Sequence, residues 1–230
     1  NDRVITEDNS NLGRVDLTTV LAKSSNVGAV RVALTMEPKA IAEALTGFGI
    51  GRLTDSAFPG ETAGKLNDPN HWRTIGQATV SYGYGVAVTT LQLARAYAAI
   101  AAGGTLRPVS LLAIDQAPPG ERVISAATTN HLTQMLEAVV AEGTGTRAAI
   151  RNFHVAGKSG TTRKAGVGGY GAERHGAIFP GFAPATDPRL VVGRPRGGRR
   201  VAGDPVRRGR ARGGRDRRPR AAAARARPRR

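Results

Sequence analysis

The chain has 230 residues, of which 40% are hydrophobic, and it carries a formal net charge of +17. This length suffices for one sizeable globular domain or part of a larger one, because single hydrophobic cores grow to roughly 250 residues. The absence of cysteine excludes a disulfide framework and a thiolate zinc site, and we expect neither a membrane span nor a signal peptide, because no apolar run approaches ~18 residues and no basic-then-apolar leader is present.

The positive charge is concentrated at the C-terminal end of the sequence. Residues 193–230 hold 16 arginines against only Asp204 and Asp216, a net charge of +14. Residues 1–192 therefore hold 18 basic and 15 acidic side chains, a net charge of +3. The globular part is thus ordinary in charge, and only the tail has the composition of a nucleic-acid binder.

The first fifty residues predict three helices. Two short helical patterns within residues 16–36 flank the polar triplet Ser24-Ser25-Asn26, which we therefore expect at a helix junction. Pro38 suits the first turn of a third helix, and Gly47 or Gly49 can take the left-handed conformation that ends one.

The middle of the chain predicts a long loop followed by a helix. Residues 51–71 are rich in Gly, Pro, Asp and Asn, which favour turns over regular structure, and we expect this loop to cover another part of the molecule. Thr89 and Gln92 have the spacing of a capping box, which predicts a helix from there to Gly103-Gly104.

A strand, a turn and a further helix are predicted next. Residues 106–114 have the composition of a strand, and Pro118-Pro119-Gly120 of a turn. An apolar stripe at helical spacing then predicts a core-facing helix that ends near Gly143; its members are Leu132, Met135, Leu136, Val139 and Val140.

The last predicted elements form a hairpin. Residues 153–158 read as a strand, residues 164–172 as a glycine-rich turn and residues 176–183 as a returning strand. A third strand opens at Leu190-Val191-Val192 and then stops, because residues 193–230 contain only Gly, Arg, Pro, Val, Ala and Asp. This alphabet cannot form a packed core, so we predict a disordered tail.

Two short polar motifs lie where predicted secondary-structure elements meet. Lys158-Ser159-Gly160-Thr161 ends a strand that enters a hairpin, and Ser24-x-Asn26 lies at the helix junction. Acyl transfer from a peptide needs an activated hydroxyl, a proton relay, an oxyanion site and a cation for a terminal carboxylate. Lys158 is the obvious cation, but no Ser-x-x-Lys nucleophile motif occurs anywhere in the sequence.

Three segments carry a family resemblance, namely residues 21–28, residues 81–85 and residues 157–162. They resemble the class B penicillin-binding proteins, in particular the division-specific peptidoglycan D,D-transpeptidases of Gram-negative bacteria, and the similarity runs from about Asn11 to Val192. The resemblance implies an α+β fold, in which an antiparallel sheet is flanked by helices as in penicillin-binding proteins and serine β-lactamases. The domain would be incomplete, truncated on its N-terminal side and aberrant at its C-terminus.

The resemblance implies a role for each residue of the two motifs. Lys158 would be the cationic dock, and the Ser159 and Thr161 hydroxyls would hold the carboxylate of the substrate or β-lactam. The Thr161 backbone N–H would supply half of the oxyanion hole. Ser24 would relay a proton to the leaving group, and Asn26 would orient the base lysine and bind the substrate amide.

Further residues belong to the predicted substrate site. Gly160 completes the tetrapeptide beside which an extended substrate would pair with the strand edge. Tyr82 and Tyr84 would line the cleft, and Arg163 would extend the anionic dock. Simpler readings stay open for all of these residues: a solvated Lys158 and Arg163, capping roles for Ser24 and Asn26, and a packed aromatic turn for the tyrosines.

The intact parent is expected to be a serine D,D-transpeptidase that cross-links peptidoglycan through an acyl-enzyme and needs no metal or organic cofactor. Its partners would be D-Ala-D-Ala stem peptides, β-lactams and divisome proteins, with a membrane anchor outside this chain at the periplasmic face of the inner membrane. A D,D-carboxypeptidase or β-lactamase of the same superfamily is one alternative. A non-catalytic remnant is another.

An arginine-rich nucleic-acid-binding protein is an alternative from a different class, since a polybasic tail binds phosphates. All six residue types of residues 193–230 have codons rich in G and C, which favours translation out of frame instead. Nucleic acid is therefore not an expected partner. The Gly-rich residues 166–171 match a dinucleotide fingerprint but open no helix, and His71, His131, His154 and His175 lack a metal-binding spacing.

Overall fold

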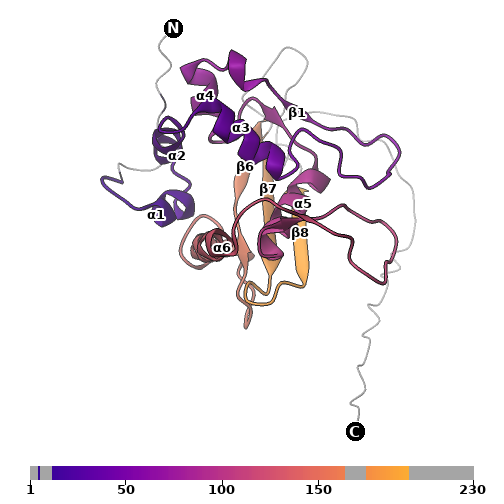
Figure 1. The fold of residues 1–230 in the computed structure, drawn as a ribbon. Coiled ribbons are helices and arrows are strands. Elements are labelled where there is room, and N and C mark those ends of the chain that lie inside the picture. The colour runs from indigo at the N-terminus through magenta and orange to yellow at the C-terminus, as the bar shows by residue number, and fades with distance from the viewer. Residues whose placement is uncertain (1–4, 6–11, 164–174, 197–230) are drawn as a thin grey trace, which may run out of the picture. The chain divides into compact units, whose positions relative to one another are not determined.

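The computed structural model describes residue 5, residues 12–163 and residues 175–196. All of them lie in the first of two compact units, residues 1–199. Within this unit the described chain forms helices and a main antiparallel sheet, together with two short strand pairs (Figure 1). The predicted α+β architecture is confirmed.

The three helices predicted for the first part of the chain are present. They are α1 (Leu17–Ala22), α2 (Asn26–Ala33) and α3 (Pro38–Gly47). Asp16 caps α1 by accepting from the Thr19 N–H, and Pro38 occupies the first turn of α3. Gly49 follows α3 with a φ of 85°, as predicted for the residue that ends this helix.

The predicted loop after α3 is present, with short elements toward its end. β1 (Lys65–Leu66) pairs with β2 (Val86–Ala87), and the 3-10 helix η1 (Pro69–His71) precedes α4 (Thr74–Val80), which the sequence patterns did not predict. The buried Gln77 side chain of α4 donates hydrogen bonds to the carbonyls of Ala33 and Met36 and so fixes α4 against the end of α2.

Two longer helices follow the predicted pattern. α5 (Thr90–Ala101) begins with the predicted capping box between Thr89 and Gln92, and α6 (Ala126–Ala141) carries the predicted apolar stripe. Between them, the strand predicted for residues 106–114 is wrong. Only β3 (Thr105–Leu106) forms, paired with β4 (Glu121–Arg122), because Ser110 makes local hydrogen bonds with Leu112 in place of a strand ladder.

The main sheet contains β5 (Ala156–Gly157), β6 (Gly160–Arg163), β7 (His175–Ala183) and β8 (Leu190–Arg196). Phe182 pairs with Ala156 and Val191, and Ile178 pairs with Gly160 and Pro195, so β7 lies between β5 and β6 on one side and β8 on the other. The predicted hairpin is therefore present as β6 and β7, while its turn, residues 164–172, falls outside the described residues.

Two strand boundaries differ from the sequence-based prediction. The strand predicted for residues 153–158 begins only at Ala156 and is interrupted at Lys158 and Ser159. Lys158 donates its backbone N–H to the Pro180 carbonyl at 3.0 Å, but proline has no N–H to return the bond. The third strand, predicted to stop after Val192, continues as β8 to Arg196 by pairing with β7.

The core lies between the sheet and the helices α5 and α6, which cover one of its faces (Figure 1). Ile100 of α5 and Leu136 of α6 pack against Ala156 of β5 and Phe182 of β7. Leu21 of α1 packs on the same cluster. The core therefore connects the helix junction that follows α1 to the strand that leads into Lys158.

Candidate active site

The junction between α1 and α2 holds Ser24 in a left-handed conformation. The Ser24 N–H donates to the Leu21 carbonyl at 3.2 Å and the Ser25 N–H to the Val20 carbonyl at 2.9 Å, the paired bonds of a Schellman helix end. Ser24 has a φ of 57° at the position where glycine is preferred. A left-handed non-glycine residue costs of order 1–3 kcal/mol, so the serine at position 24 lowers the free energy of unfolding relative to a glycine there.

The residues after Ser24 fix the start of α2. Ser25 is buried and its Oγ accepts a hydrogen bond from the Gly28 N–H at 2.8 Å, which caps the helix. A Cβ at Gly28 would lie 2.7 Å from a Val20 methyl and 2.9 Å from Ser25 Oγ, so only glycine fits there. The segment 24–28 is thus a tight corner that points Ser24 in a defined direction.

Lys158 meets Ser24 across a sequence separation of 134 residues. Its Nζ donates to Ser24 Oγ at 2.9 Å and to the Ser159 carbonyl at 2.8 Å. The side chain is partly buried, and this burial lowers the pKa of the Lys158 ammonium from its ordinary value. An ammonium has three N–H donors, so one remains for a ligand after these two bonds.

The rest of the tetrapeptide continues into β6. The Ser159 Oγ donates to Thr144 Oγ1 at 2.6 Å. Gly160 and Thr161 pair with Ile178 and Ala177 of β7, and in the part of the chain that the structure describes no strand pairs with the opposite edge of β6. That edge can therefore accept an extended peptide beside the Lys158 ammonium.

The structure brings some of the other predicted residues to this place and leaves others apart. Asn26 is the first residue of α2, two positions after Ser24, and its side chain makes no hydrogen bond to any described residue. Tyr82 and Tyr84 pack edge to face with ring centroids 5.5 Å apart, and no described interaction joins them to Lys158. Arg163 ends β6 opposite His175, but its side chain lies outside the description.

Two residues near this site, Lys23 and Thr144, were not predicted as site residues. Lys23 Nζ donates to the Glu142 carbonyl at 3.0 Å, and Thr144 accepts the hydrogen bond from Ser159. Both contacts join the end of α6 to the Ser24–Lys158 region. No local spacing marks these residues in the sequence, because their contacts depend on how α1, α6 and β6 pack together.

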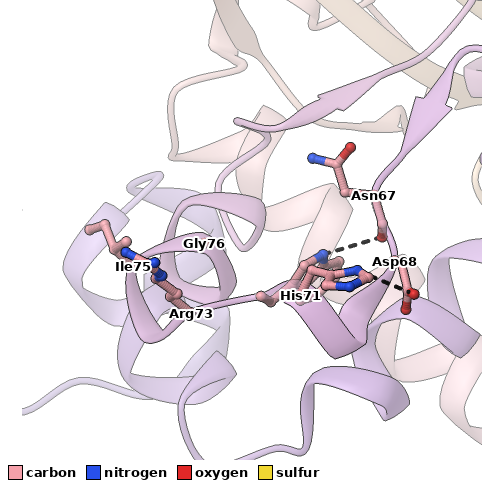
Figure 2. A pocket seen from close by; sticks show the side chains of 7 residues that line it. Asn67, Asp68, His71, Arg73, Ile75 and Gly76 are labelled. Carbon is pink, nitrogen blue, oxygen red and sulfur yellow. Dashed lines mark hydrogen bonds and ion pairs between the residues drawn. The ribbon is translucent and has the colours of Figure 1, made fainter.

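A separate surface pocket of about 440 Å³ contains none of the predicted site residues. Figure 2 shows part of its lining, in which the His71 ring faces the Asp68 carboxylate. The His71 Nδ1 lies 3.4 Å from an Asp68 carboxylate oxygen, and the Trp72 Nε1 donates to the Asn67 carbonyl at 3.2 Å. The described residues include no group of three or more metal-ligating side chains. The Ser24–Lys158 contact is therefore the arrangement with the clearest chemistry.

Comparisons with known proteins show the family to which this chain belongs. A family model, "Penicillin binding protein transpeptidase domain", matches residues 3–194. The chain is 41% identical over 179 residues to "Probable peptidoglycan D,D-transpeptidase PenA" of Neisseria flavescens, covering 77% of this chain and 45% of that protein. It is 38% identical over 202 residues to "Peptidoglycan D,D-transpeptidase FtsI" of Escherichia coli strain K12, covering 86% of this chain and 34% of that protein.

Solved structures of the same family also match this chain. The apo structure of the TP domain from Burkholderia pseudomallei penicillin-binding protein 3 matches with a TM-score of 0.79 and 44% identity, covering 84% of this chain and 59% of that one. Penicillin-binding protein 3 from Mycobacterium tuberculosis, complexed with aztreonam, matches with a TM-score of 0.72 and 32% identity, covering 77% of this chain and 44% of that one. The chain spans 34% to 45% of the length of the two curated relatives above.

Proposed function

Since this chain belongs to the penicillin-binding protein transpeptidase domain family, we propose that it is the substrate-docking part of a serine D,D-transpeptidase that cross-links peptidoglycan. The observation that carries this proposal is the 2.9 Å contact between Lys158 Nζ and Ser24 Oγ. This contact places a cation and a hydroxyl beside the open edge of β6. Docking of an extended peptide through its carboxylate requires these groups.

The proposed ligand is an extended peptide that ends in D-Ala-D-Ala. Its terminal carboxylate binds the remaining N–H of Lys158 and the hydroxyls of Ser159 and Thr161, while its backbone pairs along the open edge of β6. β-Lactams carry a comparable carboxylate and bind in the same place. Arg163 adds positive charge, and Tyr82 and Tyr84 form an apolar wall of the cleft.

Ser24, Asn26 and Lys158 serve the chemical step of the intact parent. A nucleophilic serine attacks the carbonyl of the penultimate D-Ala, its C–N bond breaks, and the terminal D-Ala leaves as an amine that must gain a proton. Lys158, with its pKa lowered by burial, exchanges a proton with Ser24, which passes it to the leaving nitrogen. The Thr161 N–H stabilises the oxyanion, and Asn26 orients the base lysine and the substrate amide.

This chain is proposed to dock its ligand without being acylated, because its sequence contains no Ser-x-x-Lys. The names of the relatives favour transpeptidation over the carboxypeptidase and β-lactamase alternatives. We further propose, from the family resemblance, that the parent acts at the periplasmic face of the inner membrane and that divisome proteins are its partners. In the described residues no helix has the length and apolarity needed to cross a membrane.

The tail is proposed to take no part in this function. Residues 193–230 have the composition of GC-rich DNA translated out of frame, and the family match ends at residue 194. Sequencing the encoding DNA tests this interpretation, since a neighbouring frame after Val192 should encode a valine-rich strand. Binding of nucleic acid that disappears when residues 193–230 are deleted would contradict it.

Reversible binding of an N-acetylated peptide ending in D-Ala-D-Ala tests the docking proposal. A charge-assisted hydrogen bond contributes about 1.5–3 kcal/mol, so Lys158→Gln should weaken binding roughly 10- to 100-fold in an NMR titration. Lys39→Gln is the matched control, because Lys39 is an exposed lysine of α3 that pairs with Glu43 on the same helix. Equal affinities of the Lys158→Gln and Lys39→Gln variants would refute the proposal.

A further inference from the structure

The pocket beside Trp72 has no part in the chemistry proposed above. Its volume of about 440 Å³ is within the range of small-ligand sites, and it is formed by residues of η1 and the start of α4 together with the segments that flank η1. In Figure 2, Asn67 lies on one side of the His71 ring and Arg73 on the other. The pocket therefore combines aromatic rings with polar side chains.

The indole ring of Trp72 is held in one orientation by local bonds. Its Nε1 donates to the Asn67 carbonyl at 3.2 Å, and the Trp72 backbone N–H donates to the Pro69 carbonyl at 3.1 Å. Asp68 caps η1 by accepting from the Asn70 N–H at 3.0 Å. Because the only polar atom of the indole is already bonded, the ring offers a ligand apolar surface, and little order has to be gained when the ligand binds.

Polar groups of the same pocket are available to a ligand. The Asn67 amide and the Arg73 guanidinium line the pocket and make no hydrogen bond or ion pair with any described residue. Apart from His71, the charged groups of the lining are one carboxylate, Asp68, and one guanidinium, Arg73, whose formal charges cancel. A neutral ligand with hydroxyl and amide groups therefore fits this pocket better than an ion does.

We propose that this pocket binds an N-acetylated sugar of the glycan that carries the stem peptide. The apolar C–H face of the sugar ring packs on Trp72, and its hydroxyls bond to the Asn67 amide. The carbonyl oxygen of the acetamido group accepts from Arg73, and the methyl group contacts Ile75, which is 41% exposed. This inference rests on the proposed function, because that function makes a glycan-linked peptide the ligand.

The place of the pocket in the fold suits a ligand that also reaches the peptide site. α4 begins at the pocket and ends beside the turn that holds Tyr82 and Tyr84, the proposed wall of the peptide cleft. Its seven residues span about 10 Å, a length that three extended peptide residues cover at roughly 3.3 Å each. The Gln77 amide fixes α4 to the end of α2. A stem peptide can therefore connect a sugar in the pocket to the tyrosine wall.

Trp72 is the only tryptophan of the chain, so its fluorescence reports on this pocket directly. The probe is a soluble oligomer of β-1,4-linked N-acetylglucosamine, compared with the glucose oligomer of the same length. Gly76→Ala places a methyl group in the pocket at an ordinary contact distance of 3.8 Å from Trp72 Cβ, so it narrows the pocket without destabilising α4. Asn67→Ala removes the free amide. Gly47→Ala and Asn70→Ala are the matched controls, because neither residue lines the pocket.

We expect a saturable fluorescence change with the N-acetylated oligomer and about fivefold weaker binding of the glucose oligomer. Gly76→Ala should weaken binding about tenfold and Asn67→Ala about fivefold, whereas both controls should bind as the unsubstituted chain does. No response to the N-acetylated oligomer, equal binding of the two oligomers, or equal binding by Gly76→Ala and Gly47→Ala would overturn this inference. Binding of the D-Ala-D-Ala peptide at Lys158 is measured separately, so its failure would overturn the proposed function and not be confused with failure at this pocket.

Discussion

The buried amide of Gln92 offers a sharp test of how the fold is held together. Its side chain is 1% exposed, its Oε1 accepts the Thr89 N–H at 2.8 Å, and its Nε2 donates to the Arg52 and Ala63 carbonyls at 2.7 and 2.8 Å. Gln92 thus caps α5 and attaches the long loop after α3 to this helix. Replacing Gln92 by leucine removes all three bonds while keeping a similar volume.

The expected cost follows from these three contacts. Each lost hydrogen bond that leaves a partner unsatisfied costs about 1 kcal/mol or more, so Gln92→Leu should lower the free energy of unfolding by about 3 kcal/mol. For a chain of this size, that loss corresponds to a decrease in Tm of about 6–12 °C. Gln92→Glu should cost at least as much at neutral pH, because a carboxylate oxygen would face the two carbonyls in place of the amide N–H donors.

Thermal unfolding followed by circular dichroism, supported by urea titration, measures both effects. Gln134 provides the control, because it is an exposed glutamine of α6 whose replacement by leucine or glutamate should change stability by less than about 0.5 kcal/mol. If Gln92→Leu were as stable as Gln134→Leu, the loop after α3 would not be attached through this amide, and the reasoning would be refuted.

Two further predictions concern the site itself. Burial lowers the folded-state pKa of Lys158 below the ordinary 10.5, so the unfolded state holds more protons between the two pKa values and stability should rise with pH in that window. Carboxylate binding should fall as pH rises through the lowered pKa. If the Lys158→Gln variant showed the same pH dependence of stability and binding in this range as the unsubstituted chain, this prediction would be contradicted. Gly28→Ala places a Cβ against Val20 and should cost about 1–3 kcal/mol, whereas Gly47→Ala in α3, with no atom within 4 Å, should be neutral or stabilising in the same unfolding measurement.

The helices α3, α5 and α6 were predictable because their signals are local. The capping box of Thr89 and Gln92, the proline at the start of α3 and the apolar stripe of α6 all act within a few residues of the helix they specify. The family resemblance, which rested on short motifs near Ser24 and Lys158, was confirmed by the match over residues 3–194.

The strands were predicted less well because each depends on a partner elsewhere in the chain. Residues 106–114 have suitable composition for a strand, yet only β3 finds a partner there, in β4. The interruption at Lys158 and Ser159 is caused by Pro180 on the opposite strand, and β8 continues beyond Val192 because β7 offers it a ladder. Composition alone cannot encode these pairings.

Within the candidate site, residue types were predictable and their geometry was not. The motifs singled out Ser24 and Lys158, but the left-handed conformation of Ser24 follows from the Schellman bonds to Val20 and Leu21. The contact of Thr144 with Ser159 requires α6 to end beside α1. Such contacts arise only from tertiary packing.

The most direct test is to map where a D-Ala-D-Ala peptide binds by recording amide chemical-shift changes in the ¹⁵N-labelled chain. We predict that the largest changes occur at Lys158, Ser159 and Thr161 and at the facing residues 24–26. Changes confined to another surface, such as the pocket beside Trp72, would contradict it.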